Sequence, residues 1–96
     1  VIPSKLFRPP YGRLSSKQAR SLNLNDFQIV MWTILSGDYD SKLSNIQCAN
    51  RVIENLYPGS IILFHDSEKA ERNMLFALES VLKFASKNGY GFDVIK

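Results

Sequence analysis

Polar residues with catalytic chemistry follow three apolar segments of this chain. The segment 60–64 ends on His65, the only histidine, and Asp66 comes next. An earlier segment leads to Asp38, and the first leads to Arg8. An aspartate can orient an imidazole and favour its charged form, and an arginine can hold a carboxylate in place. These residue types suit a hydrolase, although the sequence has no evident nucleophile or metal-ligand cluster; the alternative is a histidine that only caps its strand.

The apolar run at 60–64 follows the turn pair Pro58-Gly59 and is too short to form a helix. Such a run predicts a strand buried on both faces, as in parallel sheets. Further strands are predicted at 5–7, 27–32 and 90–95. Because the carboxyl ends of parallel strands share one edge of a sheet, where α/β proteins place their chemistry, we expect the three polar groups to converge.

Three helices are predicted between these strands, at 15–22, 44–56 and 72–88. Capping boxes mark the first two starts, with Gln18 three residues after Ser15 and Gln47 three after Ser44. Apolar residues at helical spacing predict the buried faces of the second and third helices: Ile46, Ala49, Val52, Ile53 and Leu56, then Leu75, Leu78, Val81, Leu82 and Ala85. The alternation of strands and helices predicts an α/β fold with one parallel sheet.

The loop Arg8-Pro9-Pro10-Tyr11-Gly12 is expected to be stiff, because proline fixes its own backbone and the glycine permits a conformation that a side chain would oppose. It would display Arg8 and Tyr11 at the end of the first strand. The alternative is an edge turn with a surface arginine.

Composition limits the other classes of function. The chain has 96 residues and a net charge of +3, but its twelve Lys and Arg residues are scattered, which argues against a nucleic-acid partner. No apolar run approaches the roughly 20 residues of a membrane span. No signal peptide is expected, because Val1-Ile2-Pro3 lacks a basic start and an apolar core. The single Cys48 allows no internal disulfide, and a buried structural thiol is expected there.

Three segments together resemble the polysaccharide deacetylases of carbohydrate esterase family 4. They are Phe7-Arg8-Pro9-Pro10-Tyr11-Gly12, then Trp32 with Asp38-Tyr39, then Leu63-Phe64-His65, in the order and spacing of the family's third, fourth and fifth motifs. The resemblance covers nearly the whole chain. It implies that residues 1–96 form a single partial domain, about half of a distorted (β/α)7 barrel that removes N-acetyl (or O-acetyl) groups from a polysaccharide.

The resemblance also implies a role for each matching residue. Arg8 would orient the carboxylate that acts as base, Asp38 would pair with His65, and His65 would be the general acid that protonates the departing amine. The backbone N–H of Tyr11 would help to hold the oxyanion, and Leu63 would line the pocket for the acetyl methyl. The other substrate-binding positions would be Pro10, Trp32 and Tyr39.

Two departures from the family pattern stand out. The fourth motif usually reads D-x-x-D-W, whereas Leu35 and Tyr39 replace its first aspartate and its tryptophan, which affects the shape of the sugar groove. The family's Asp-Asp and His-x-x-x-His motifs should precede Arg8, where this sequence has seven residues. They supply the base and the ligands of a divalent metal, with zinc as the first candidate. We therefore expect this chain alone to bind no metal and to be inactive.

Three functions stay open. The chain is the C-terminal part of a metal-dependent deacetylase whose N-terminal half is supplied separately, or it is a non-catalytic binding or assembly module. The second option arises because half a barrel leaves bare strand edges and apolar helix faces, which favour a second chain such as a homodimer partner. The third is an amidase of the same fold acting on a small cyclic amide. The resemblance implies a location at the cell envelope or outside the cell.

Overall fold

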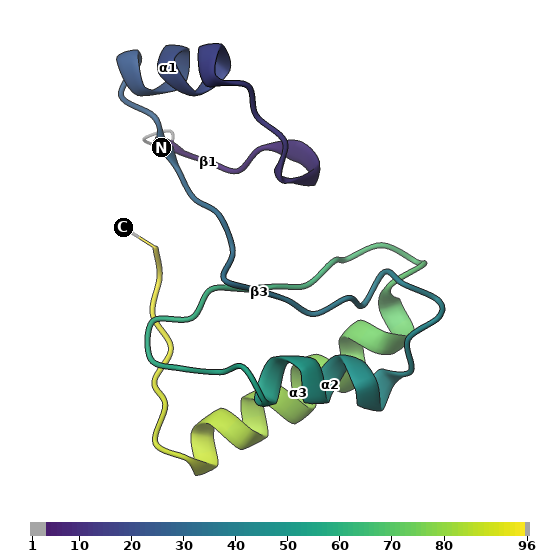
Figure 1. Cartoon of the computed structure of the whole chain (residues 1–96). Helices are drawn as coiled ribbons and strands as arrows, with labels where there is room; N and C mark the ends of the chain where they lie inside the picture. The colour runs from purple at the N-terminus through teal and green to yellow at the C-terminus, as the bar shows by residue number, and fades with distance from the viewer. Residues whose placement is uncertain (1–3, 96) are drawn as a thin grey trace. The chain divides into compact units, whose positions relative to one another are not determined.

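The computed structural model describes residues 4–95 (Figure 1). These residues form two compact units, divided in the sequence between Met31 and Trp32. The first unit contains β1 (Leu6–Phe7), the 3-10 turn η1 (Pro10–Gly12), α1 (Ser16–Leu24) and β2 (Gln28–Ile29). The second contains β3 (Ile34–Leu35), α2 (Asn45–Ile53), β4 (Ile62–Leu63) and α3 (Glu71–Lys87). No helix in residues 4–95 combines the length and apolar character needed to cross a membrane.

The strands form two parallel pairs, β1 with β2 and β3 with β4. Parallel pairing is confirmed, but the prediction of one sheet is wrong for the described residues, which form two separate strand pairs. The strand expected at 27–32 is shortened to β2, and β3 lies beyond the predicted range. β2 pairs with β1, whereas β3 pairs with β4, so the chain changes its hydrogen-bonding partner between β2 and β3. The backbone N–H of Val30 donates to Phe7 in the first pair, whereas Thr33 bonds to Ile61 through both its backbone N–H (2.8 Å) and its hydroxyl.

Two other strand predictions need correction. The strand at 60–64 is present as β4, but its residues are half-buried rather than buried on both faces. The segment 90–95 forms no strand, and Phe92 and Val94 are 65% and 73% exposed. A strand requires a neighbouring edge to satisfy its backbone N–H and C=O groups. Within the described residues, the segment 90–95 pairs with no such edge.

The core of the second unit lies between its two helices and the β3–β4 pair. Ile34, Val52 and Val81 form one buried cluster. A second buried cluster consists of small side chains, Cys48 and Ala49 of α2 and Ala77 of α3. Phe64, which follows β4, packs against both clusters. The core therefore fixes the carboxyl end of β4 against the helices.

Both predicted capping boxes are confirmed. The hydroxyls of Ser15 and Ser44 each accept a hydrogen bond from the glutamine backbone three residues on, and the side chains of Gln18 and Gln47 bond back to the serine N–H groups. Local hydrogen bonds of this kind need no distant partner, so they follow directly from the sequence.

The predicted buried faces are only partly correct. Val81 and Ala85 of α3 are buried as expected, but Leu75 and Leu82 are 56% and 44% exposed. Ile46 of α2 is likewise exposed. The helices pack against each other through small side chains. The buried face of α3 therefore consists of residues spaced four apart: Asn73, Ala77, Val81 and Ala85.

The start of α2 gives a stability prediction. Replacing Ser44 by Ala removes the acceptor for the Gln47 N–H and should lower the free energy of unfolding by about 1 kcal/mol. Urea denaturation would measure this loss. Ser41→Ala, in the exposed turn before the helix, is the matched control and should change stability by less than about 0.5 kcal/mol; equal losses would contradict the capping role.

The single cysteine gives a second prediction. Cys48 is fully buried, as expected from the sequence, and burial raises the pKa of its thiol, with the charge of Asp38 raising it further. A raised pKa keeps the thiol protonated, and the thiolate is the reactive form. An aromatic disulfide reagent should therefore label Cys48 slowly in the native protein and rapidly in urea. Equal rates in the two conditions would show that the thiol is accessible.

Candidate functional site

His65 and Asp38 are joined by two hydrogen bonds at one end of strands β3 and β4. Asp38 follows β3, and His65 follows β4, so parallel pairing brings the two residues to the same end. Asp38 Oδ1 lies 2.8 Å from His65 Nδ1, and Asp38 Oδ2 accepts the backbone N–H of His65 at 2.7 Å. One carboxylate therefore fixes both the position of the His65 backbone and the orientation of its ring.

The two side chains differ in exposure. The Asp38 side chain is fully buried, whereas that of His65 is 38% exposed. Because an ionised carboxylate can only accept hydrogen bonds, we assign the Nδ1 proton of His65 to the bond with Asp38. Nε2 is then the ring nitrogen left to act on a substrate. A buried acceptor holding an accessible imidazole is a suitable arrangement for proton transfer.

The backbone before Asp38 is shaped by a glycine. Gly37 has a φ of +77°, a conformation that favours glycine, and a Cβ added there would lie 2.7 Å from the Arg51 Nη1 atom. The fully buried Ser36 accepts the Asp38 N–H on its hydroxyl at 3.3 Å. The packing of Arg51 against this turn leaves no room for a side chain at position 37.

The other predicted residues of the second unit surround the pair to different degrees. The Tyr39 ring stands edge-on to the His65 ring, with their centroids 5.1 Å apart. Leu63 is half-buried on β4, in register with Leu35 of β3. Trp32 is half-buried just before β3. Tyr39 therefore forms one wall beside the imidazole.

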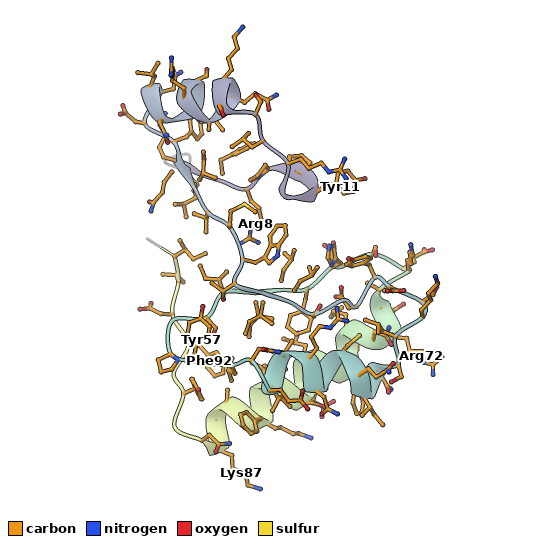
Figure 2. The ribbon with its side chains drawn as sticks, in the orientation of Figure 1. Arg8, Tyr11, Tyr57, Arg72, Lys87 and Phe92 are labelled. Atoms are coloured by element: carbon orange, nitrogen blue, oxygen red, sulfur yellow. The ribbon has the colours of Figure 1, made fainter. Side chains whose placement is uncertain are left out.

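Arg8, Pro10 and Tyr11 lie in the first unit. The Arg8 Nε atom donates to the carbonyl of Val30 at 3.1 Å, which anchors the arginine at the end of the β1–β2 pair. Tyr11 is 94% exposed and projects from η1 (Figure 2). Its φ of +56° is uncommon for a residue with a side chain. The convergence of this loop with His65 stays a prediction, since the two belong to different units.

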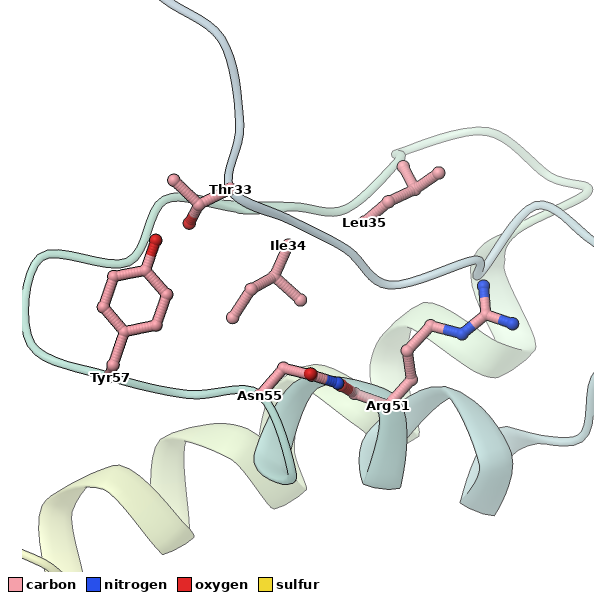
Figure 3. Close-up of a pocket in the computed structure, with 6 residues that line it drawn as sticks. All are labelled: Thr33, Ile34, Leu35, Arg51, Asn55 and Tyr57. Atoms are coloured by element: carbon pink, nitrogen blue, oxygen red, sulfur yellow. The ribbon is translucent and has the colours of Figure 1, made fainter.

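Neither of two cavities contains His65. The first unit has a cavity of about 310 Å³ between η1 and α1, with Pro10 in its wall. The second unit has one of about 250 Å³ between β3 and α2 (Figure 3). Its polar wall comes from Arg51, Asn55, Tyr57 and Thr33. The His65–Asp38 pair is thus defined by the strand ends and not by either hollow.

The described residues do not fit a metal centre. Within 4–95, no three His, Cys, Asp or Glu side chains gather closely enough to hold an ion. His65 already places its Nδ1 against Asp38, whose two oxygens are both hydrogen-bonded. No step of the chemistry is therefore assigned to a metal held by this part of the chain.

Comparison with known proteins identifies relatives with one activity, although no family model matches the sequence. A peptidoglycan-N-acetylglucosamine deacetylase of Bacillus cereus is 35% identical over 63 residues, which cover 66% of this chain and 22% of the relative. A second B. cereus protein of that name is 28% identical over 88 residues, covering 91% and 41%. A chitooligosaccharide deacetylase of Azorhizobium caulinodans is 34% identical over 61 residues, covering 62% and 28%.

Solved structures agree with these relatives. A peptidoglycan N-acetylglucosamine deacetylase bound to a hydroxamate-type benzamide superposes with a TM-score of 0.81 at 28% identity, over 93% of this chain and 42% of that chain. A family 4 carbohydrate esterase from Streptomyces lividans in complex with acetate gives a TM-score of 0.79 at 26% identity, over 96% and 45%.

This chain has an α/β fold, and the relatives and solved structures that it resembles are deacetylases and a family 4 carbohydrate esterase. The resemblance to the polysaccharide deacetylases of carbohydrate esterase family 4 is confirmed, since the curated relatives and solved neighbours are deacetylases of that family. The chain spans less than half the length of the proteins it matches. These neighbours have a (β/α)7 barrel, and this chain shows a small α/β part with parallel strands.

Sequence reasoning missed the polar residues behind the site. Asn73 of α3 is 9% exposed and hydrogen-bonds the loop that carries Asp38. Its spacing of four from Ala77 and eight from Val81 places it on the buried stripe, and this spacing was the available signal. The apolar series through Leu75 and Leu82 was predicted as the buried face instead, and Asn73 does not belong to that series.

The buried carboxylate gives a third prediction. Asp38→Asn keeps one oxygen acceptor, but it removes the negative charge that strengthens both hydrogen bonds from His65. The free energy of unfolding should fall by about 1–3 kcal/mol, measured by urea denaturation. Asp40→Asn is the control, because Asp40 Oδ1 accepts only the exposed Lys42 N–H in the neighbouring turn. A loss in Asp40→Asn as large as that in Asp38→Asn would contradict the special role of the buried pair.

Proposed function

We propose that this chain carries the general acid of a metal-dependent polysaccharide deacetylase. In the complete protein, the reaction is the hydrolysis of N-acetyl (or O-acetyl) groups on a glycan. The observation that carries the proposal is the pair of hydrogen bonds that Asp38 accepts from His65. The relatives are deacetylases of peptidoglycan and of chitooligosaccharides, and they suggest the substrate class.

His65 acts when the carbon–nitrogen bond breaks. An amine leaves a tetrahedral intermediate readily only after its nitrogen is protonated, so the reaction needs a positioned acid. The imidazolium of His65 gives its Nε2 proton to that nitrogen and keeps the Nδ1 proton in the bond to Asp38. The carboxylate stabilises the charged ring before transfer and holds the same tautomer afterwards.

The remaining roles concern the carbonyl and the sugar. We assign the backbone N–H of Tyr11 to the developing oxyanion, which is favoured by a preorganised donor. Arg8 orients the catalytic base, and Leu63 lines the pocket for the acetyl methyl. We assign sugar binding to Tyr39, which contacts the His65 ring, and separately to Pro10 and Trp32.

The catalytic base and the divalent metal, with zinc as the first candidate, belong to residues outside 4–95 in this proposal. The support is chemical: the described side chains offer no three-ligand group. The relatives act on acetylated glycans, and their length leaves room for such residues in a complete protein. A location at the cell envelope or outside the cell fits a peptidoglycan or chitin-like substrate.

A second candidate function is a non-catalytic assembly module. It is favoured by the exposed Leu75 and Leu82 of α3 and by the unpaired segment 90–95. Exposed apolar side chains and strand-forming residues favour association with a second chain, including a second copy. Sedimentation equilibrium at micromolar concentration distinguishes the cases, since a monomer would count against the homodimer.

The acid role gives a fourth prediction, for the complete protein that carries this sequence. His65→Ala should lower kcat for acetate release from N-acetylglucosamine oligomers by about 10²–10⁴-fold, the usual contribution of a positioned acid. KM should change little, because the interaction is made in the transition state. Asp66→Asn, the exposed neighbour, is the control and should keep its activity.

The same assay tests the choice of substrate. A deacetylase releases acetate from the oligomers and leaves small cyclic amides intact, whereas an amidase of this fold shows the reverse. Full activity of His65→Ala on the oligomers would overturn the assignment of the acid.

A further inference from the structure

Asn73 connects α3 to both ends of one loop. Its Nδ2 atom donates to the carbonyl of Asp38 at 3.4 Å and to the carbonyl of Leu43 at 3.1 Å. Asp38 lies three residues after the end of β3, in the loop between β3 and α2, and Leu43 immediately precedes the N-cap of α2. A single buried amide therefore fixes the loop where it leaves the strand and where it enters the helix.

A buried amide costs free energy unless its polar atoms are paired. Asn73 is 9% exposed and lies in the stripe whose other buried members are alanines and a valine. An apolar residue at this position would continue the packing of α3, but it would leave the two loop carbonyls without this donor. The hydrogen-bonding role of Asn73 is therefore separate from the packing of the helix.

Hydrogen bonds link Asn73 to Asp38 and Asp38 to His65, and the chain after His65 leads back to α3. The side chain of Asp38 holds His65, and Asn73 holds the backbone of Asp38. The chain after His65 returns through the fully buried Ala70 to α3, the same helix that carries Asn73. Displacement of the Asp38 backbone would thus lengthen both hydrogen bonds to His65, which are 2.7 and 2.8 Å long.

We propose that Asn73 is a positioning residue that sets the orientation of the His65 imidazole through the backbone of Asp38. The geometric part of this inference stands without any activity, whereas its effect on rate rests on the proposed function. The residue contacts the loop and not the reacting atoms. Its loss should therefore affect the pair more than the rest of the fold.

The test compares Asn73→Ala with Val81→Ala in the complete protein. Val81 lies eight residues further along the same buried stripe, packs against Ile34 and Val52, and has no polar group. It therefore matches the packing loss without the hydrogen bonds. Asn73→Leu, which keeps the volume and removes the donor, serves if the alanine variant does not fold.

The first readout is the tautomer of His65, followed by long-range ¹⁵N–¹H NMR, with the His65 signals identified by their loss in His65→Ala. We expect the Nδ1–H form to dominate in the wild type and in Val81→Ala. In the Asn73 variant, the ring should sample both tautomers. The second readout is acetate release, in which kcat should fall by roughly tenfold or more in the Asn73 variant alone, with KM unchanged.

The outcomes separate the two claims. If the Asn73 and Val81 variants change the tautomer equally, or if neither does, the positioning role is overturned. If only the Asn73 variant changes it and kcat falls, the inference holds in full. If the tautomer changes but the wild-type protein releases no acetate, the proposed function fails while the positioning of His65 by Asn73 is retained.

Discussion

The carboxylate of Asp38 is the constraint on which the rest of the second unit depends. A charged group without solvent exposure is tolerated only when its oxygens are well hydrogen-bonded, and here His65 supplies a donor to each. The parallel register of β3 and β4 brings the two residues to the same end of the strands. The core of α2 and α3 then holds that strand end through Phe64. Local burial, strand register and ring orientation are therefore linked.

The departures from the family pattern have physical consequences at this strand end. Leu35 replaces an aspartate, and it lies in register with Leu63, so an apolar pair spans the two strands where the family has a charge. Tyr39 replaces a tryptophan, and its ring contacts the imidazole edge-on. His65 keeps Asp38 as its partner and has an aromatic neighbour, so under the proposed function the acid is retained while the surface offered to a sugar differs.

The exposed apolar side chains are consistent with a chain that spans less than half of its relatives. Leu75 and Leu82 lie on a helical series that the sequence predicts to be buried, and the segment 90–95 has the alternation of a strand without a paired edge. Neither feature is covered by a neighbour within residues 4–95. The buried face of α3, in contrast, is complete within this unit and includes the amide of Asn73.

The sequence by itself determined what local chemistry controls. The two capping boxes and the motif residues His65 and Asp38 were predictable, because each signal lies within a few residues or in a recognisable pattern. Only the tertiary structure decided the separation of β2 and β3 into two strand pairs, the rotation of the buried face of α3 and the burial of Asn73. These depend on which small side chains allow two helices to approach and on which distant carbonyls need a donor, and helical periodicity contains neither piece of information.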